Sequence, residues 1–400
     1  MPPAPPGSGF HTLARFKRLQ AVAQWAHLEP KELGTLSQTS ALPHTLSEQF
    51  VENSLGNFPL PLGLAVHFVV DGAPVVVPMA VEESSVIAAA SHGAKLAAAG
   101  GGFTTKVMDP VTVGQVELRG VKDPAGAKRA VARRAKAWVA QLNATIPSMV
   151  ARGGGVRRIE ARAVGRGRLV LHVHVDTRDA MGANTVNTLC EALAPMAAEA
   201  LRATPGLRIL TNLADTRLAT ATCVVPATAL GGGSTVDAIV AANEFALADP
   251  YRAATHNKGI LNGVDPVLVA TGNDWRAVEA GAHAYAARNG RYTALTRYAR
   301  TKAGDLAAEL TMPLALGVVG GVTRLHPTAQ VVLKVLGNPD ARRLAAIAVS
   351  VGLAQNIAAL RALAGEGIQR GHMRLHATNR ALAQATAEPV ATTGTSGPPA

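Results

Sequence analysis

Two short polar segments carry residues suited to proton transfer and to the stabilisation of negative charge. Glu82 and Glu83 follow an apolar run and precede an Ala-rich segment. In the first turn of a helix such carboxylates would be solvated and favoured by the helix dipole, whereas a buried one would stay protonated near neutrality and could donate its proton. Lys258 is expected on a turn between two apolar segments, either as an ordinary loop lysine or as a cation that stabilises an oxyanion.

Three further segments offer weaker signals. Asp274 either caps the helix predicted to begin at Trp275 or orients Lys258 and a protonated glutamic acid. Residues 179–184 lie between a predicted strand and a predicted helix, where a glycine and backbone N–H groups could cradle a pyrophosphate. His372 follows a long apolar segment, and a lone histidine there is more often structural or exposed than catalytic.

The surrounding sequence predicts the elements that position these residues. A helical pattern covers residues 13–46, and short β-rich runs in residues 60–80 flank an Asp-Gly pair, which is typical of a hairpin. Residues 82–99 are predicted as a small-residue helix that three glycines stop. The next predicted elements are strand 111–121, helix 125–143, strands 159–164 and 169–175, helix 183–203 and strand 207–210. Their β-α-β-β-α-β order indicates a ferredoxin-like unit inserted into a larger one.

Bulk composition narrows the class of protein. The 400 residues are 48% hydrophobic and 16% charged, which is a globular composition. The net charge of +12 raises nucleic acid as a partner, but the basic region from Lys122 to Arg168 contains a single aromatic residue, Trp138, so a solvated basic face is favoured. Two cysteines, Cys190 and Cys223, are too few for a disulfide framework and indicate a reducing compartment.

Known short motifs are missing from the sequence. No Walker A loop, no G-x-G-x-x-G after a strand and no H-E-x-x-H is present, and no metal site is expected. The N-terminus lacks the pattern of a secretory signal. Residues 344–363 are apolar but interrupted by polar side chains, which indicates a buried helix rather than a membrane span.

The polar segments nevertheless match one family in order and in wording. The matching stretches lie between Leu13 and Arg380, at residues 52–56, 81–85, 101–105, 179–187, 254–259, 272–280 and 367–373. The last three read Ala-Thr-His-Asn-Lys-Gly, Gly-Asn-Asp-Trp-Arg-Ala-Val-Glu-Ala and Gly-Ile-Gln-Arg-Gly-His-Met. The chain resembles the class II (bacterial, degradative-type) 3-hydroxy-3-methylglutaryl-CoA (HMG-CoA) reductases.

The resemblance implies an α+β fold with a helix-rich substrate-binding domain and an inserted ferredoxin-like nucleotide-binding domain. The large domain would comprise residues 10–108 and 218–371, and the small one residues 109–217. A truncated C-terminal flap would remain as residues 372–384. Residues 1–9 are expected to form a disordered leader, and residues 385–400 a disordered tail.

The resemblance also implies roles for individual residues. Glu83 would be the acid, Lys258 the cation at the oxyanion, Asp274 the carboxylate that links them, and His372 the donor to the leaving CoA thiolate. The residues implied to hold the substrate are Ser85, Arg252 and Asn262. Those implied to contact the dinucleotide are Asp179, Met181, Gly182, Asn184 and Asn212.

The activity implied is the interconversion of HMG-CoA with mevalonate plus CoA by two successive hydride transfers, in mevalonate degradation. A homodimer or an oligomer of dimers in the cytoplasm is expected, with residues 52–56 contributing to the subunit interface and with no nucleic-acid or membrane partner. The alternatives are an NADP-dependent biosynthetic enzyme and a non-catalytic or impaired acyl-CoA-binding relative.

Three departures from the family pattern concern ligand binding and closure. Ile146 stands where NADH-preferring relatives carry an aspartate, and three arginines follow at 152, 157 and 158. NAD is favoured because the rest of the chain resembles the NADH-using group, with NADP as the alternative. Phe10-His11 replaces a Phe-Arg pair that contacts CoA in some relatives, so CoA affinity is expected to be weaker. Relatives also continue beyond the histidine into a fuller flap.

Overall fold

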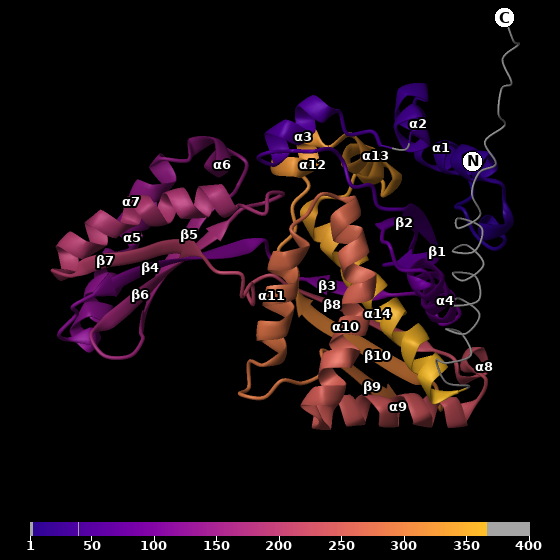
Figure 1. The fold of residues 1–400 in the computed structure, drawn as a ribbon. Coiled ribbons are helices and arrows are strands. Elements are labelled where there is room, and N and C mark those ends of the chain that lie inside the picture. The colour runs from indigo at the N-terminus through magenta and orange to yellow at the C-terminus, as the bar shows by residue number, and fades with distance from the viewer. Residues whose placement is uncertain (1–2, 39, 366–400) are drawn as a thin grey trace, which may run out of the picture.

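The computed structural model describes residues 3–38 and 40–365, in two bodies (Figure 1). The larger body is built on one four-stranded sheet, and the smaller one on another that residues 111–210 form. The expected α+β fold with an inserted ferredoxin-like unit is confirmed. The expected flap remnant, His372 and the C-terminal tail lie outside the described residues.

The N-terminal segment forms short helices that pack on a hairpin. These helices are η1 (Phe10–Thr12), α1 (Arg15–Ala26), α2 (Pro30–Ser37) and α3 (His44–Phe50), and the hairpin strands are β1 (Leu62–Val70) and β2 (Ala73–Ala80). The hairpin turn places Asp71 and Gly72 at positive φ, as a two-residue turn that matches the strand twist requires. Ahead of η1, Pro6 is buried and the Phe10 N–H donates to the Gly7 carbonyl.

The large body is an antiparallel sheet covered by helices. Its strands are β3 (Thr104–Val107), β8 (Leu218–Val225), β10 (Leu306–Pro313) and β9 (Thr296–Arg300), in that spatial order. The helices are α4 (Val86–Ala98), α8 (Ala227–Leu230), α9 (Gly233–Ala248), α10 (Pro250–Ala270), α11 (Trp275–Ala286), α12 (Gly321–Leu325), α13 (Pro327–Val335) and α14 (Ala341–Ala364).

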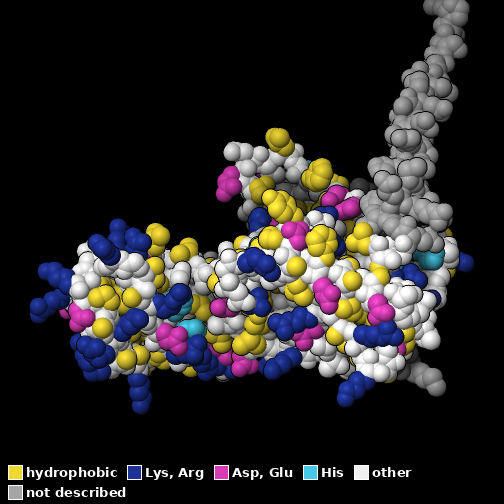
Figure 2. Space-filling model, turned by 90° about the horizontal axis from the view of Figure 1, so that it is seen from below, with side chains coloured by type: hydrophobic (Ala, Val, Ile, Leu, Met, Phe, Trp, Pro, Cys, Tyr) yellow, Lys and Arg dark blue, Asp and Glu magenta, His cyan; other side chains and the backbone are white. Residues whose placement is uncertain are grey.

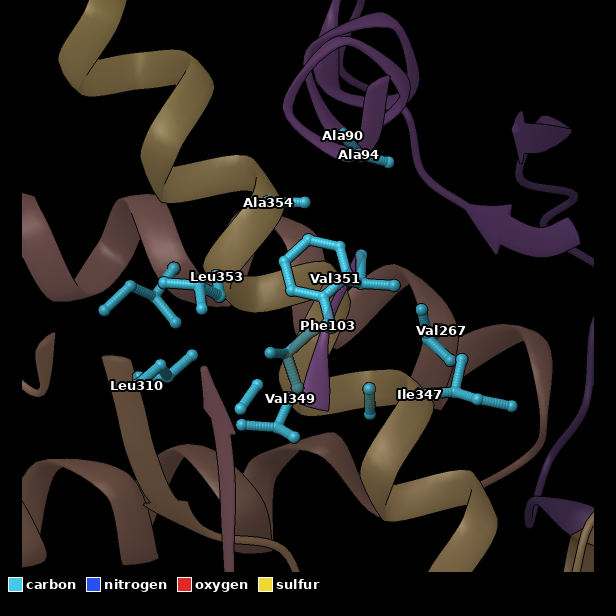
Figure 3. Close-up of a cluster of buried hydrophobic side chains, with 14 of the residues drawn as sticks. Ala90, Ala94, Phe103, Val267, Leu310, Ile347, Val349, Val351, Leu353 and Ala354 are labelled. Carbon is cyan, nitrogen blue, oxygen red and sulfur yellow. The ribbon is translucent and has the colours of Figure 1, made fainter. Parts of the chain in front are cut away.

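Helix α14 runs through the centre of the large body. Figure 3 shows its Ile347, Val349 and Val351 among side chains from other elements, with Ala354 facing α4. The close approach depends on missing side chains: a Cβ at Gly93 of α4 would lie 1.9 Å from the Ala354 carbonyl oxygen, and one at Gly263 of α10 would lie 2.9 Å from the Val351 carbonyl oxygen. Glycines therefore set the spacing of α4 and α10 from α14.

The small body has ferredoxin-like topology. Its elements are β4 (Val111–Arg119), α5 (Pro124–Ala144), α6 (Pro147–Ala151), β5 (Gly155–Ala163), β6 (Arg168–Asp176), α7 (Ala183–Leu201) and β7 (Thr204–Leu210), with the antiparallel order β5-β6-β4-β7. Residues such as Leu171 and Leu189 form its core between the sheet and the helices. Lys and Arg side chains gather on its surface, at the left of Figure 2, and helix α5 supplies several of them.

Two local predictions were wrong. Lys258 does not lie on a turn, because α10 continues without interruption through Asn257 and Gly259. The helix expected from residue 82 begins only at Val86, because Ser85 adopts a left-handed backbone conformation with φ 72°. Glu82 and Glu83 consequently lie in the connection between β2 and α4, and not in a helical turn.

Helix α14 is long and apolar enough to cross a membrane by length and composition alone. Within the protein, however, 89% of its most apolar window is buried, which identifies a core helix as expected from the sequence. In the part of the chain that the structure describes, no group of three or more His, Cys, Asp or Glu side chains could hold a metal ion.

Replacing Gly93 by Ala is expected to destabilise the protein by about 1–3 kcal/mol, because the added methyl group would meet the α14 backbone, which cannot turn away. Chemical denaturation of the purified protein measures this. Gly34→Ala in α2 is the matched control: no atom lies within 4 Å of a Cβ there, and the change should be neutral or stabilising. An unchanged stability of Gly93→Ala would show that the two helices can move apart at little cost.

Candidate active site

One face of α10 brings two of the predicted polar residues together. Lys258 and Asn262 are one helical turn apart, so their side chains lie on the same face. The Lys258 ammonium nitrogen lies 3.6 Å from Oε2 of Glu83, in the connection between β2 and α4. The structure thus joins an acid and a cation that are 175 positions apart in the sequence.

The connection that carries Glu83 is held in an uncommon backbone conformation. Ser85 has φ 72°, and its hydroxyl does not cap α4, which leaves this side chain available at the start of the helix. A left-handed conformation is strained for a residue with a Cβ and occurs often at functional sites. Arg252 lies in the first turn of α10, where Asp249 accepts a hydrogen bond from its backbone N–H.

Buried polar side chains fix the position of α10 behind Lys258. Asn257 is fully buried, donating through Nδ2 to the Thr293 carbonyl and accepting the Leu295 N–H. His256 is within hydrogen-bond distance of Thr296 Oγ1 at 2.6 Å, and burial lowers the pKa of His256 to about 4. The neutral His256 and the hydrogen-bonded Asn257 side chain thus give rigid support to the exposed Lys258, which follows them in the helix.

Asp274 acts as the N-cap of α11, one of the two alternatives that the sequence left open. Its Oδ1 accepts the Ala277 N–H at 3.1 Å and lies 3.7 Å from a guanidinium nitrogen of Arg276. Among the described residues it forms no hydrogen bond or ion pair with Lys258 or Glu83. The preceding residue, Asn273, accepts the Gly317 N–H and so ties this turn to the segment after β10.

The acid and the cation are both partly exposed to solvent. The Lys258 and Glu83 side chains retain 63% and 46% of their accessible surface, and that of Asp274 retains 45%. Among the described residues, Glu83 therefore matches the solvated alternative that the sequence left open. A site of this chemistry needs a ligand or another polypeptide segment to exclude water.

The loop between β6 and α7 leads into a helix N-terminus that has no side-chain cap. Gly182 precedes α7 with φ 92°, and a Cβ there would lie 2.3 Å from Cγ2 of Thr177, so only glycine allows this approach. Because Gly182 offers no side-chain cap, the first backbone N–H groups of α7 remain available to a phosphate. Asn184 is exposed in the same turn, and the Met181 carbonyl accepts the Thr112 hydroxyl.

Two other residues expected at the dinucleotide face the large body. Asp179 accepts the Ala341 N–H at 3.0 Å, at the start of α14, and its carbonyl accepts the Val318 N–H. Asn212 is exposed, and its carbonyl oxygen would lie 2.6 Å from a Cβ at Gly281 of α11. Both residues thus lie where the small body meets the large one.

A pair of carboxyl groups between α10 and α11 was missed by the sequence analysis. Asp265 lies on the same face of α10 as Asn262, and its carboxyl group is close enough to that of Glu279 in α11 for the two to interact. Burial, followed by the charge of Glu279, raises the pKa of Asp265 from 3.8 to about 8. No sequence signal marks this pair, because Asp265 and Glu279 lie in different helices whose contact is tertiary.

A cavity of about 660 Å³ lies beside this region, between the N-terminal helices, the hairpin and α13. Its wall is mainly apolar and includes Phe10, with the cationic residues Arg15 and Arg18. The lining also includes Ala80 and Gly272, which precede Glu83 and Asp274 by three and two residues. Glu83 and Lys258 do not line it themselves.

The chain is similar to known proteins over most of its length. The family described as hydroxymethylglutaryl-coenzyme A reductase matches residues 14–377. The Archaeoglobus fulgidus 3-hydroxy-3-methylglutaryl-coenzyme A reductase is 46% identical over 94% of this chain and 86% of its own length. A probable enzyme of the same name from Borreliella burgdorferi is 32% identical over 92% of this chain and 86% of its own length.

Solved structures give the same result. The class II 3-hydroxy-3-methylglutaryl-CoA reductase of Streptococcus pneumoniae, bound to NADPH in open conformations, superposes with a TM-score of 0.86 at 41% identity, covering 89% of this chain and 99% of that one. Another structure of the S. pneumoniae enzyme gives a TM-score of 0.88 over 95% of this chain and 92% of its own. The fold is that of the class II 3-hydroxy-3-methylglutaryl-CoA reductases. The chain belongs to the hydroxymethylglutaryl-coenzyme A reductase family.

The Asp265–Glu279 pair predicts a pH dependence of stability. The folded protein keeps a proton on Asp265 that the unfolded chain releases above pH 3.8, so this contribution to the free energy of unfolding is complete below pH 3.8 and is lost as the pH rises to about 8. Asp265→Asn should therefore flatten the fall of Tm with pH in this window, as followed by thermal denaturation.

The matched control for this experiment is Glu244→Gln, which changes an exposed carboxylate on α9. It should leave the pH dependence of Tm unchanged. A wild-type slope in Asp265→Asn would mean that the Asp265–Glu279 pair does not hold a proton in the folded protein.

Proposed function

We propose that this chain interconverts HMG-CoA with mevalonate and CoA, with Glu83 and Lys258 at the reacting carbonyl. The observation that carries the proposal is the 3.6 Å approach of the Lys258 ammonium to the Glu83 carboxylate on the open face of α10. Ser85 directly precedes α4, Arg252 and Asn262 lie on α10, and these three residues are proposed to bind the hydroxymethylglutaryl portion. The family assignment supports the same activity.

The proposed chemistry follows from the charges at the site. Two reduced nicotinamide cofactors, bound one after the other, would each supply one hydride. Lys258 stabilises the oxyanion that forms at the thioester carbonyl, and Glu83 donates a proton to the oxygen when the aldehyde becomes an alcohol. His372, which lies outside the described residues, is proposed to protonate the departing thiolate. Asp274 is proposed to reach this pair through its position at the start of α11, once the site closes.

The dinucleotide is proposed to bind the loop that precedes α7, through Met181, Gly182 and Asn184. Asp179 and Asn212 are proposed to complete the site from the junction of the two bodies. The unfilled first turn of α7 supports a diphosphate at this place. The NADPH-bound state of the S. pneumoniae relative supports a nicotinamide cofactor.

NADP is proposed here as accepted, although the sequence favoured NAD. Ile146 precedes α6 and carries no charge to repel a 2′-phosphate. Two guanidinium groups, of Arg157 and Arg178, converge on the single Asp176 carboxylate, at 2.7 and 3.6 Å, which leaves net positive charge near α6. Both Arg side chains are about half exposed, so they remain accessible to an added phosphate.

The remaining parts of the proposal concern CoA and assembly. The apolar cavity with Arg15 and Arg18 is proposed to hold the pantetheine arm and a phosphate of CoA. A homodimer is proposed because Leu55 and Phe58, in and beside the 52–56 segment, are almost fully exposed. The cytoplasm is the proposed compartment, since Cys190 and Cys223 are free and buried. Mevalonate oxidation remains the proposed direction.

Lys258→Met should lower kcat for HMG-CoA reduction by about 100-fold or more, because the oxyanion loses its cation. Glu83→Gln should lower reduction of the aldehyde by a similar factor. Absorbance of the reduced cofactor and release of free thiol measure the two half-reactions, and the same assay with mevalonate and CoA measures the reverse direction.

Lys302→Met, at an exposed lysine in the β9–β10 turn, is the control and should retain full activity. Wild-type turnover in Lys258→Met would remove Lys258 from the mechanism, and an inactive wild-type protein would favour a non-catalytic acyl-CoA-binding role.

Ile146→Asp should shift the cofactor preference toward NADH by about tenfold or more, because a carboxylate repels the 2′-phosphate and binds the ribose hydroxyls. The ratio of kcat/KM for NADH and NADPH measures this. Ile146→Asn is the uncharged control and should shift the ratio much less. If Ile146→Asp left the ratio unchanged, the adenosine ribose would have to bind away from α6.

A further inference from the structure

Arg217 is a buried cation at the junction of the two bodies. It directly precedes β8, where the chain returns from the small body to the large sheet, and its residue exposure is 4%. Nearby, the Met108 N–H donates to the Leu218 carbonyl, so the outgoing and returning chains run side by side at this point. The proposed mechanism assigns no role to this side chain.

The Arg217 guanidinium bonds to both bodies at once. Its Nη2 donates to the carbonyl of Leu316 in the large body at 2.7 Å. Its Nη1 faces the small body, within 3.2 Å of Thr112 Oγ1 and 3.3 Å of Thr177 Oγ1. The same nitrogen lies 3.4 Å from the Met181 carbonyl and 3.5 Å from the Ala180 carbonyl. The loop that leads into α7 is thereby held against the segment that follows β10.

Hydrogen bonds around the guanidinium reinforce this arrangement. Thr112 also donates its hydroxyl to the Met181 carbonyl at 3.1 Å, and Thr177 donates to the Ala180 carbonyl at 2.8 Å. The Arg217 carbonyl accepts the Leu314 N–H. The two segments are closely packed, since a Cβ on Gly317 would lie 2.6 Å from the Met181 backbone nitrogen. A lysine would keep the charge but lose this arrangement, because its ammonium is a compact point charge without the planar fork with which Arg217 reaches both bodies.

The charge of Arg217 has no carboxylate of its own. Among the described residues no ion pair includes Arg217, and Asp176, the acid that acts on it most, is paired with Arg157 and Arg178. Burial lowers the pKa of Arg217 to about 10, against the opposing effect of Asp176. A buried cation that only neutral carbonyls and hydroxyls surround is costly, and an anion bound nearby would offset part of that cost.

We propose that Arg217 is the positioning residue for the dinucleotide. Its guanidinium fixes the Ala180–Met181 backbone relative to the large body, and its uncompensated charge favours a diphosphate at the adjacent N-terminus of α7. The inference rests on the proposed binding of a nicotinamide dinucleotide to this loop. It adds a residue that touches neither the substrate site on α10 nor the first turn of α7.

The test measures dinucleotide binding separately from substrate binding. Arg217→Met should raise the Kd for NADH and NADPH about tenfold or more, because the loop loses a charged hydrogen-bond donor, while the Kd for HMG-CoA stays within about twofold. The Kd for the dinucleotide should also rise less steeply with salt, since one cation has been removed. Arg208→Met is the matched control on β7, where the exposed guanidinium donates to the neighbouring Gly206 carbonyl.

Two milder variants keep the proposal testable if Arg217→Met does not fold. Arg217→Lys retains the charge but loses the fork, so it should raise the dinucleotide Kd and keep the wild-type salt dependence. Thr112→Val removes the hydroxyl shared by Arg217 and Met181 and should act in the same direction.

Wild-type dinucleotide Kd values in folded Arg217→Met, or in both milder variants, would overturn the inference. Equal weakening of HMG-CoA and dinucleotide binding would also overturn it, because that result describes a general loss of structure. A wild-type protein that binds neither NADH nor NADPH would instead refute the proposed function.

Discussion

The spacing of α10 from α14 is the constraint on which the site depends. Helix α14 is almost wholly buried, so it offers a fixed surface to every element that packs on it. Gly263 lets α10 approach the α14 backbone closely, and the opposite face of α10 then presents Lys258 and Asn262. On the other side Gly93 brings α4 to α14, and the connection before α4 carries Glu83. The acid and the cation meet because α4 and α10 both pack against α14.

A second set of contacts places the small body relative to this core. Asp179 bonds to the start of α14, Asn273 bonds to Gly317 beside Asp274, and Arg217 reaches both the β6–α7 loop and Leu316. All of these bonds converge on a few backbone segments, while the two four-stranded sheets remain separate. The relation between the two bodies is thus carried by directional hydrogen bonds more than by a shared apolar core.

Much of the fold follows from sequence patterns because those patterns are local. The β-α-β-β-α-β order of residues 111–210, the hairpin at Asp71-Gly72 and the buried helix at 341–364 all depend on periodicity or turn residues. The family wording placed Glu83 and Lys258 in one site, and the structure brings them within 3.6 Å. The sequence did not reveal that Lys258 lies within a helix. Gly259 and Gly263 follow Lys258, and a glycine in a turn cannot be told by sequence from a glycine that lets two helices approach.

The residues that sequence reasoning missed depend on contacts between distant segments. Asp265 and Glu279 come together only when α10 and α11 pack, and burial together with the charge of Glu279 then raises the pKa of Asp265. Arg217 stands in an unremarkable Asp-Thr-Arg stretch, and its burial arises from loops at residues 177–181 and 314–317. The half-exposed state of Glu83 and Lys258 was also unpredictable, because it depends on what covers α10 in the folded chain.

The late position of α14 in the chain has a consequence for folding. Residues 111–210 form a sheet and its covering helices from one contiguous stretch, so this unit can close as soon as it leaves the ribosome. The hairpin, α4 and β3 are made earlier but pack against a helix that is synthesised more than 200 residues later. Their apolar surfaces therefore stay exposed while the inserted unit is synthesised. We expect formation of the large body to be the slow step of folding, and these surfaces to be the part most prone to aggregation.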